Sequence, residues 1–442
     1  DDVSESFVVT WSASIDKDFL SYTLLEGISD ESDSMDVIFT TNSVDDTTFT
    51  VSGIFGEINR YYLVRVHDTV NNQTDSNVEQ GYSPPDILFW NNVYGDTDVS
   101  DWGNSIIEVD DGYWIAGVSN QAMRLLKIDL LGNIVSDQNI FSGYANKIID
   151  DEDGFLYIVG GTGSWNNSYM NIIKLDDNGN FQTSLQIESS EYGAAWAYGA
   201  IMADSPTSDE YIYVYGEMDG MAVVYSVDQD LNNFELVYLN DEMIRVKDMT
   251  KLDNGYLISS SNDEHTNVVK TNLSFESQYE ITVDGYSRSI SSTEDGNVLL
   301  VMQTGDMEHT MMKFNISTSI VNWQISADGI YNGFEVDGSY YALGHHNGAS
   351  LFMKLDINGN IISSSTFGSG VISDYSLTSD GGLVLTGTTN YWNDQLSDTP
   401  VFKTDLEGTN PTGNGRFNNG IVEGNSIIIP NLNNLDLNHR PF

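Results

Sequence analysis

The chain has 442 residues, of which 40% are hydrophobic, so it can build several packed domains and is not a disordered chain. Its 66 acidic and 17 basic residues give a formal net charge of −49, which repels nucleic acid and anionic membranes and favours solubility in a salty or extracellular setting. There is no cysteine, which excludes thiol catalysis, disulfides and cysteine-ligated zinc. No run of about 18 apolar residues occurs, so we expect no direct membrane insertion.

Four apolar runs near the start of the chain predict short β-strands. They are Phe7–Trp11, Ser21–Glu26, Phe49–Ile54 and Tyr61–Val66. With a tryptophan closing the first run, they resemble strands B, C, E and F of fibronectin type III domains, which implies a β-sandwich over residues 1–83. Strand A of that family would precede residue 1. Either the chain is a piece of a longer polypeptide, or another chain supplies the strand by β-augmentation.

A phrase of an apolar stretch, lysine, any residue, and aspartate or asparagine recurs through the rest of the chain. Its copies are spaced by 41 to 52 residues, which is the length of a propeller blade. One copy has serine in place of lysine. The phrase positions are Lys127, Lys174, Ser226, Lys270, Lys313, Lys354 and Lys403.

Two further signals accompany each phrase. An Asp-Gly or Asn-Gly turn and an apolar strand that often ends in glycine come before it, as at Asp153-Gly154 and Phe155–Gly160. A turn such as Asn178-Gly179 and another short strand come after it. Because such turns suit tight hairpins, each unit predicts four antiparallel strands, and there are seven units.

The last unit lacks its fourth strand, because residues 408–413 are rich in glycine and proline. Residues 87–94, before the first unit, resemble such a strand. Closing the ring with this segment removes two exposed sheet edges. We therefore predict an all-β chain: a fibronectin type III-like sandwich, then a seven-bladed β-propeller over residues 86–410 closed by an N-terminal strand.

These phrases resemble the propeller repeats of secreted bacterial and archaeal proteins, sometimes called delta-60 repeats. Asp380-Gly381-Gly382 and the turn through Asn180 match that pattern, whereas the family tryptophan is replaced, for example by Ile172. The resemblance implies secretion and a role in binding or scaffolding, without chemistry.

Aromatic residues mark candidate ligand contacts on one face of the predicted propeller. Exposed aromatics beside Asn and Asp suit glycan or peptide binding. The alternative is that those opening the innermost strands simply pack between blades. The candidates in the loops between second and third strands are Trp165, Tyr169, Tyr391 and Trp392, and those opening innermost strands are Trp102 and Trp196.

Histidines and acidic turns raise the question of metals. His265, His309 and His345 fall in or beside the same kind of loop in three consecutive blades, and such residues can ligate zinc, nickel or copper. The alternative is solvated loop histidines. Turns such as Asp150–Gly154 and Asp176–Asn180 superficially resemble calcium loops, but they also suit aspartates that bond their own backbone. Bound Ca²⁺ is compatible with the acidity, and no other cofactor is expected.

No catalytic constellation stands out, because nucleophile elbows, phosphate loops and zinc-protease motifs are all missing. Arg124, Arg245 and Arg288 show no grouping in phase with the repeat, so we expect no enzyme. The recurring lysine ends a strand beside an acidic turn, which predicts charge-assisted bonds within or between blades.

Residues 411–442 follow the predicted propeller as a tail without a place in it. Its apolar positions are candidates for assembly: the tail either packs on its own propeller or completes the sandwich of another chain, which would build a filament. These positions are Ile421, Val422, Ile427, Ile428 and Ile429.

Taken as a whole, the sequence predicts a non-enzymatic extracellular or cell-surface protein for structure or adhesion, with a filament subunit as one form. Its partner would be a protein or a glycan. The alternative is a carbohydrate-binding or carbohydrate-active propeller that uses the loops bearing aromatics and histidines.

Overall fold

The computed structural model describes residues 6–27, 32–52, 58–70, 72–83, 89–95, 98–151, 153–164, 167–189, 193–203, 211–305, 308–389, 396–408 and 438–439. The chain divides into two compact units, residues 1–87 with 379–381 and residues 88–378 with 382–442. Apart from the short 3-10 turn η1 (Ser32–Ser34), the regular structure of the described part is β. Across those residues, no helix is long and apolar enough to cross a membrane.

The first unit contains two antiparallel sheets. One pairs β1 with β4; the other has the order β3-β2-β5-β6, with β7 also paired to β5. Tyr22 and Leu24 of β2, Tyr62 and Val64 of β5 and Val51 of β4 form one buried cluster, so the two sheets share a core. All four predicted strands are therefore confirmed. The strands are β1 (Ser6–Thr10), β2 (Phe19–Gly27), β3 (Asp36–Thr41), β4 (Thr48–Ser52), β5 (Ile58–Asp68), β6 (Gln73–Asp75) and β7 (Glu79–Ser83).

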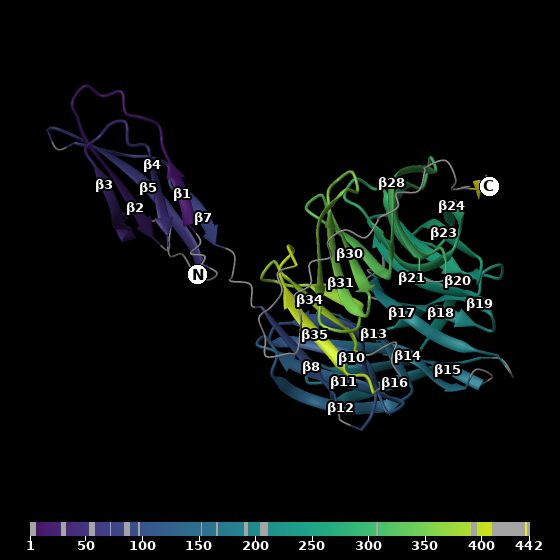
Figure 1. Ribbon diagram of the computed structural model, residues 1–442. Coiled ribbons are helices and arrows are strands. Elements are labelled where there is room, and N and C mark those ends of the chain that lie inside the picture. Colours follow the sequence, from purple (N-terminus) through teal and green to yellow (C-terminus); the bar gives the residue numbers. More distant parts are fainter. Residues whose placement is uncertain are drawn as a thin grey trace. The chain divides into compact units, whose positions relative to one another are not determined.

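The second unit is a propeller-like repeat of antiparallel sheets (Figure 1). Its described residues form seven sheets, six of them from strands consecutive in the chain. The first three sheets are β9 (Asp101–Val109), β10 (Gly112–Ser119), β11 (Ala122–Asp129) and β12 (Ile134–Ser142); β13 (Tyr144–Asp150), β14 (Phe155–Ser164), β15 (Asn167–Asp176) and β16 (Phe181–Glu188); and β17 (Ala195–Ala203), β18 (Tyr211–Met218), β19 (Met221–Asp228) and β20 (Phe234–Asn240).

The next three sheets continue the pattern. They are β21 (Arg245–Leu252), β22 (Gly255–Ser261), β23 (His265–Asn272) and β24 (Ser277–Asp284); β25 (Tyr286–Ser292), β26 (Val298–Gln303), β27 (Glu308–Asn315) and β28 (Ile320–Asp328); and β29 (Ile330–Val336), β30 (Ser339–His346), β31 (Ala349–Leu355) and β32 (Ile361–Phe367). A fifth strand, β36 (Asn438–His439), pairs with β24.

The seventh sheet joins both ends of the unit. It consists of β33 (Val371–Leu377), β34 (Leu383–Thr388), β35 (Thr399–Thr404) and, from before the first sheet, β8 (Trp90–Tyr94). Thr399 pairs with Tyr94 and Lys403 with Trp90. The predicted strand exchange between the two ends is confirmed.

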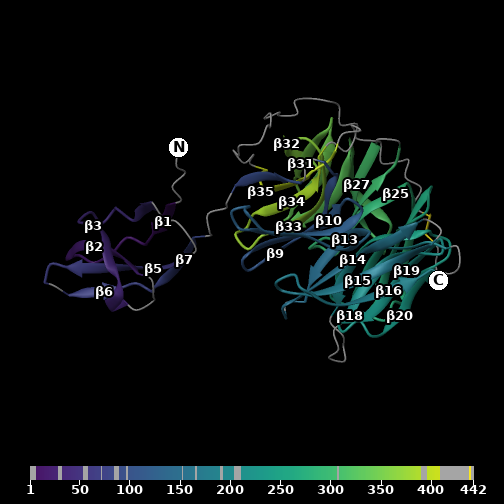
Figure 2. The ribbon, with the colours of Figure 1, turned by 90° about the horizontal axis from the view of Figure 1, so that it is seen from below.

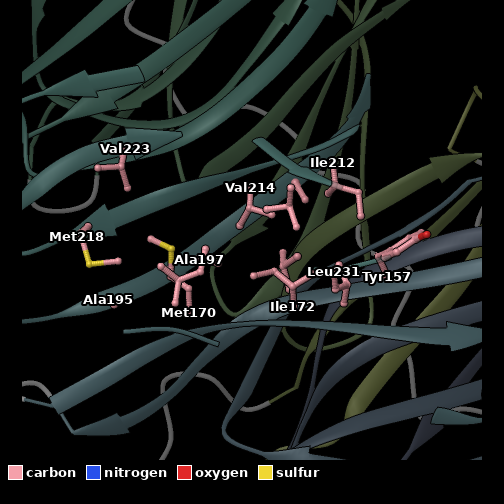
Figure 3. Close-up of a cluster of buried hydrophobic side chains, with 14 residues drawn as sticks. Tyr157, Met170, Ile172, Ala195, Ala197, Ile212, Val214, Met218, Val223 and Leu231 are labelled. Carbon is pink, nitrogen blue, oxygen red and sulfur yellow. The ribbon is translucent and has the colours of Figure 1, made fainter. Parts of the chain in front are cut away.

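The first strands of the seven sheets are here called the innermost strands. Each contacts the innermost strand of the next sheet, and β9 contacts β33, so the first sheet meets the last. Figure 2 shows β33, β9 and β13 following one another. The sheets pack face to face: Tyr157, Met170 and Ile172 of the second sheet meet Ile212 and Val214 of the third (Figure 3).

Every innermost strand carries a β-bulge at the same place, where its pairing with the second strand skips one residue. In five sheets the second strand has glycine opposite the bulge. A Cβ built at one of them, Gly160, would lie 1.8 Å from the carbonyl oxygen of Tyr144. The bulge therefore explains why the second strands often end in glycine.

The recurring lysine ends the third strand of its sheet, as predicted, and its charge-assisted bonds are confirmed in several sheets. Lys127 Nζ lies 2.8 Å from Asp111, and Lys313 Nζ lies 2.7 Å from Asp295. Lys403 is fully buried and donates to Thr378. These bonds fix the turn ends of neighbouring strands.

Candidate functional site

Four consecutive innermost strands place cations and tyrosines together. Tyr198, Lys247, Arg288 and Tyr331 are the bulge residues of β17, β21, β25 and β29, because each is the residue that the pairing skips. A bulge changes the direction of its side chain relative to the rest of the strand. All four are half-buried. With the strand-opening residues Arg245 and Tyr286, they are called here the cation–tyrosine cluster.

The cations of this cluster lie over the tyrosine rings. Lys247 Nζ is 4.3 Å from the ring centre of Tyr198 and 5.1 Å from that of Tyr286. The guanidinium of Arg288 is 5.3 Å from Tyr286 and 5.0 Å from Tyr331. Since such contacts are attractive, the tyrosines hold like charges together that would otherwise repel each other.

The charges of the cluster are only partly compensated. Arg245 lies 3.6 Å from Glu217, and burial raises the pKa of this carboxyl group. Arg288 donates to the neutral amide oxygen of Gln303 at 2.6 Å. Burial also lowers the pKa of Lys247. Burial alone would raise the pKa of Tyr286, but Lys247 and Arg245 outweigh it and lower that pKa. The cluster therefore offers positive charge and hydrogen-bond donors to an anion.

Arg245 and Arg288 occupy different positions of the repeat, as the sequence predicts, since Arg245 opens its strand and Arg288 is a bulge residue. They nevertheless come together, because they lie on adjacent innermost strands and share contacts with Tyr286. Arg124 lies elsewhere, on β11, where it pairs with Asp137 at 2.6 Å. The missed signal was the alignment of innermost strands at their bulges, which aligns Lys247 with Arg288.

Two of the candidate metal ligands pack beside the cluster. His345 stacks on Tyr331 with ring centres 5.4 Å apart, and His309 meets the same ring edge-on at 5.0 Å. Both are buried, and burial lowers the pKa of His345. His265 instead lies 3.0 Å from Asp284. In the part of the chain that the structure describes, no group of three or more His, Asp or Glu is placed to hold a metal ion.

The predicted aromatic contacts divide into three groups. Trp102, on β9, remains 38% exposed and thus available to a ligand. Trp196, on β17, is half-buried and meets Tyr144 edge-on at 6.2 Å, as the packing alternative expects. Tyr169, on β15, is half-buried. The candidates outside the described residues are Trp165, Tyr391 and Trp392, and so are Ile421, Val422, Ile427, Ile428 and Ile429 of the tail.

Aspartates one residue beyond the bulge tie the innermost strands together. Asp374 of β33 accepts from Lys147 Nζ at 2.7 Å, from the Ser105 hydroxyl at 2.6 Å and from the Ile106 N–H at 3.2 Å. Asp248 of β21 occupies the equivalent position and accepts from the N–H of the following innermost strand at 2.9 Å. These carboxylates are structural links between sheets, and burial raises the pKa of Asp248.

The acidic turns that resemble calcium loops are satisfied by their own backbone where the structure describes them. In Asp176–Asn180, the Asp176 carboxylate accepts from the N–H groups of Asn178 and Asn180 at 3.0 and 2.8 Å. The side-chain hydrogen bond from Asn180 is the main cause that lowers the pKa of Asp176. The same geometry recurs at Asp129 and Asp356. This confirms the turn interpretation; bound Ca²⁺ stays a prediction.

The comparisons with known proteins concern the fold alone. No family model matches the chain, and no curated protein matches it. A functionally unknown protein from Desulfotomaculum acetoxidans is similar at 12% identity, with 68% of this chain and 91% of that one covered and a TM-score of 0.44. Saccharomyces cerevisiae Sqt1 is similar at 9% identity, with 73% and 99% covered and a TM-score of 0.44. Likeness at this level carries no inference about a ligand.

Proposed function

We propose that this chain is a non-enzymatic, secreted surface protein for adhesion, and that its propeller-like unit binds an anionic glycan through the cation–tyrosine cluster. The observation that carries the proposal is the gathering of Arg245, Lys247 and Arg288 on adjacent strands of a chain with a net charge of −49. The negative charge of the rest of the chain repels anions, so three clustered cations favour a site that binds an anionic ligand.

The chemistry of the cluster favours a carboxylate-bearing sugar. Guanidinium groups bind carboxylates with paired hydrogen bonds, and tyrosine rings stack on the apolar faces of sugars. Trp102 is exposed on the innermost strand β9 of another sheet and adds a second aromatic surface. We further infer that the second unit is a complete seven-bladed propeller and that the first unit is a fibronectin type III-like spacer.

A glycan array tests this function. We expect binding to glycans that contain uronic or sialic acid and none to their neutral counterparts. The variant Arg288→Gln should weaken the signal, whereas Arg65→Gln, which removes a cation of the first unit paired with Asp75, should keep it. Equal binding of neutral glycans, or an unchanged signal in Arg288→Gln, would contradict the proposal.

Self-assembly is a second candidate, favoured by one observation. The short strand β36, near the C-terminal end, adds to the outer edge of β24, where Ile281 pairs with His439. This supports the idea that tail segments add to free sheet edges, in the same chain or in another. Size-exclusion chromatography of a chain cut after residue 410 tests it: an unchanged assembly state would contradict assembly through the tail.

A further inference from the structure

A cavity of about 700 Å³ lies at the opposite end of β21 and β25 from the cation–tyrosine cluster. Its walls come from the turn after β21, the turn after β25 and the end of β23. Leu257, Val298 and Ile316 on its lining are all buried. The volume is in the range of small-molecule sites, about 300 to 1,000 Å³.

Lys270, one of the six recurring lysines, lines this cavity. The other five are engaged: Lys127, Lys174, Lys313 and Lys354 have acidic partners, and Lys403 donates to a threonine. For Lys270, the described residues provide no hydrogen bond, ion pair or ring contact. A half-buried ammonium without a partner favours an acceptor that is supplied from outside.

The cavity exists because aromatic residues are missing at two positions. Lys127, Lys174, Lys313 and Lys354 each lie 4.9 to 5.9 Å from the centre of an aromatic ring. That ring comes from the residue opposite on the second strand, such as Trp114 or Tyr341, or from the next sheet, as with Tyr340. Around Lys270 the equivalent positions hold the smaller Leu257 and Val298.

The rest of the lining is mainly polar. Lys251 adds a second cation, Asn254 and Asn297 add amides, and Asp253 and Glu294 add carboxylates that can accept from hydroxyl groups. Leu257 and Val298 expose only 2% and 1% of their surface, so the groups that a ligand can reach are mainly polar. A dianionic phosphate would be repelled by Asp253 and Glu294 more strongly than a monoanionic carboxylate, and it would bring no ring hydroxyl groups to the amides.

We propose that this cavity binds a hexuronate, with its carboxylate on Lys270 and its hydroxyl groups on the amides and carboxylates of the lining. This site is separate from the cation–tyrosine cluster and does not depend on it. Both sites together would let one unit contact an acidic polysaccharide from two sides.

Ligand-observed NMR and calorimetry on the full chain, with glucuronate, glucose and inorganic phosphate as probes, test the proposal. We expect glucuronate to bind and the other two to bind at least about tenfold more weakly. Lys270→Gln should lose this site, and so should Leu257→Tyr, which installs a ring of the kind that fills the position in other sheets. Arg288→Gln should retain it.

A matched control comes from the same repeat position. Lys174→Gln changes an equivalent lysine that has a partner, Asp230, and should bind glucuronate as the unmodified chain does. Because Lys270 has no partner among the described residues, Lys270→Gln should also keep the midpoint of unfolding. Unchanged glucuronate binding in Lys270→Gln would overturn the cavity proposal, and so would phosphate or glucose binding as tightly as glucuronate. The proposal for the cation–tyrosine cluster is tested separately, because weaker glycan-array binding in Arg288→Gln would support it whatever Lys270→Gln does.

Discussion

Replacing Asp374 by alanine tests whether the first and last sheets are linked as described. The carboxylate of Asp374 accepts three hydrogen bonds, one from Lys147 and two from β9. A charge-assisted bond contributes about 1.5 to 3 kcal/mol and a neutral one about 0.5 to 1.5 kcal/mol. Their effects overlap, and the side chain of Lys147 is 30% exposed and regains water. We therefore expect a loss of about 3 kcal/mol in the free energy of unfolding.

Guanidinium unfolding followed by tryptophan fluorescence measures this loss. Seven of the eight tryptophans lie in the second unit, so the signal reports on that unit. Asp374→Asn keeps the shape and should lose less stability. Asp177→Ala, at an exposed turn, is the control and should change the free energy by less than about 0.5 kcal/mol. If Asp374→Ala is no more destabilising than that control, the carboxylate does not link the first and last sheets.

Three further predictions concern stability. Lys403→Ala removes a fully buried side chain and should lower the free energy of unfolding by about 3 kcal/mol. Lys354→Ala should lower it by at most about 1 kcal/mol, because the acidic partner of Lys354 is 63% exposed. Equal losses for the two variants in chemical unfolding would contradict this. Gly160→Ala should lower the free energy of unfolding by about 2 kcal/mol or more, because its Cβ would lie 1.8 Å from a carbonyl oxygen. A thermal midpoint equal to that of the unmodified chain would contradict the bulge as the reason for this glycine. Burial raises the pKa of Asp295, but hydrogen bonds led by that from Lys313 outweigh it and lower the pKa from 3.8 to about 2. The stabilisation by Asp295 is complete above the unfolded pKa and is lost as pH falls from 3.8 to about 2. The variant Asp295→Asn should therefore lose less unfolding free energy over this pH range, by at most about 1 kcal/mol because Asp295 is 52% exposed. Identical profiles of unfolding free energy against pH for the variant and the unmodified chain would refute this.

The repeat was predictable because local chemistry marks it. Asp-Gly turns and the Lys-x-Asp phrase fix where hairpins end, and the structure places Lys127 and Lys313 at the ends of third strands as expected. The strand β8 was predictable because the last unit lacked a partner for β35. The turns and the Lys-x-Asp phrase lie within one blade of sequence, whereas β8 and β35 come from opposite ends of the second unit.

The cation–tyrosine cluster was not predictable in this way, because it depends on side chains from different sheets. Tyr198, Lys247 and Arg288 become neighbours only when the innermost strands are aligned at their bulges, and a bulge leaves no gap in the sequence. The glycine opposite it was a usable signal, but the two sheets that carry the cations have Ser260 and Met302 there instead. The cavity beside Lys270 likewise follows from missing rings.

The central claim is that the cation–tyrosine cluster binds a carboxylate-bearing glycan. Isothermal titration of an acidic oligosaccharide of several uronate residues into the full chain tests it most directly. In a Lys270→Gln background, which removes the cavity site, we expect the double variant Arg245→Gln/Arg288→Gln to weaken binding at least about tenfold, or 1.4 kcal/mol, and Arg65→Gln to leave it unchanged. If the double variant in this background binds as tightly as Lys270→Gln alone, the cluster is not the glycan site and the claim fails.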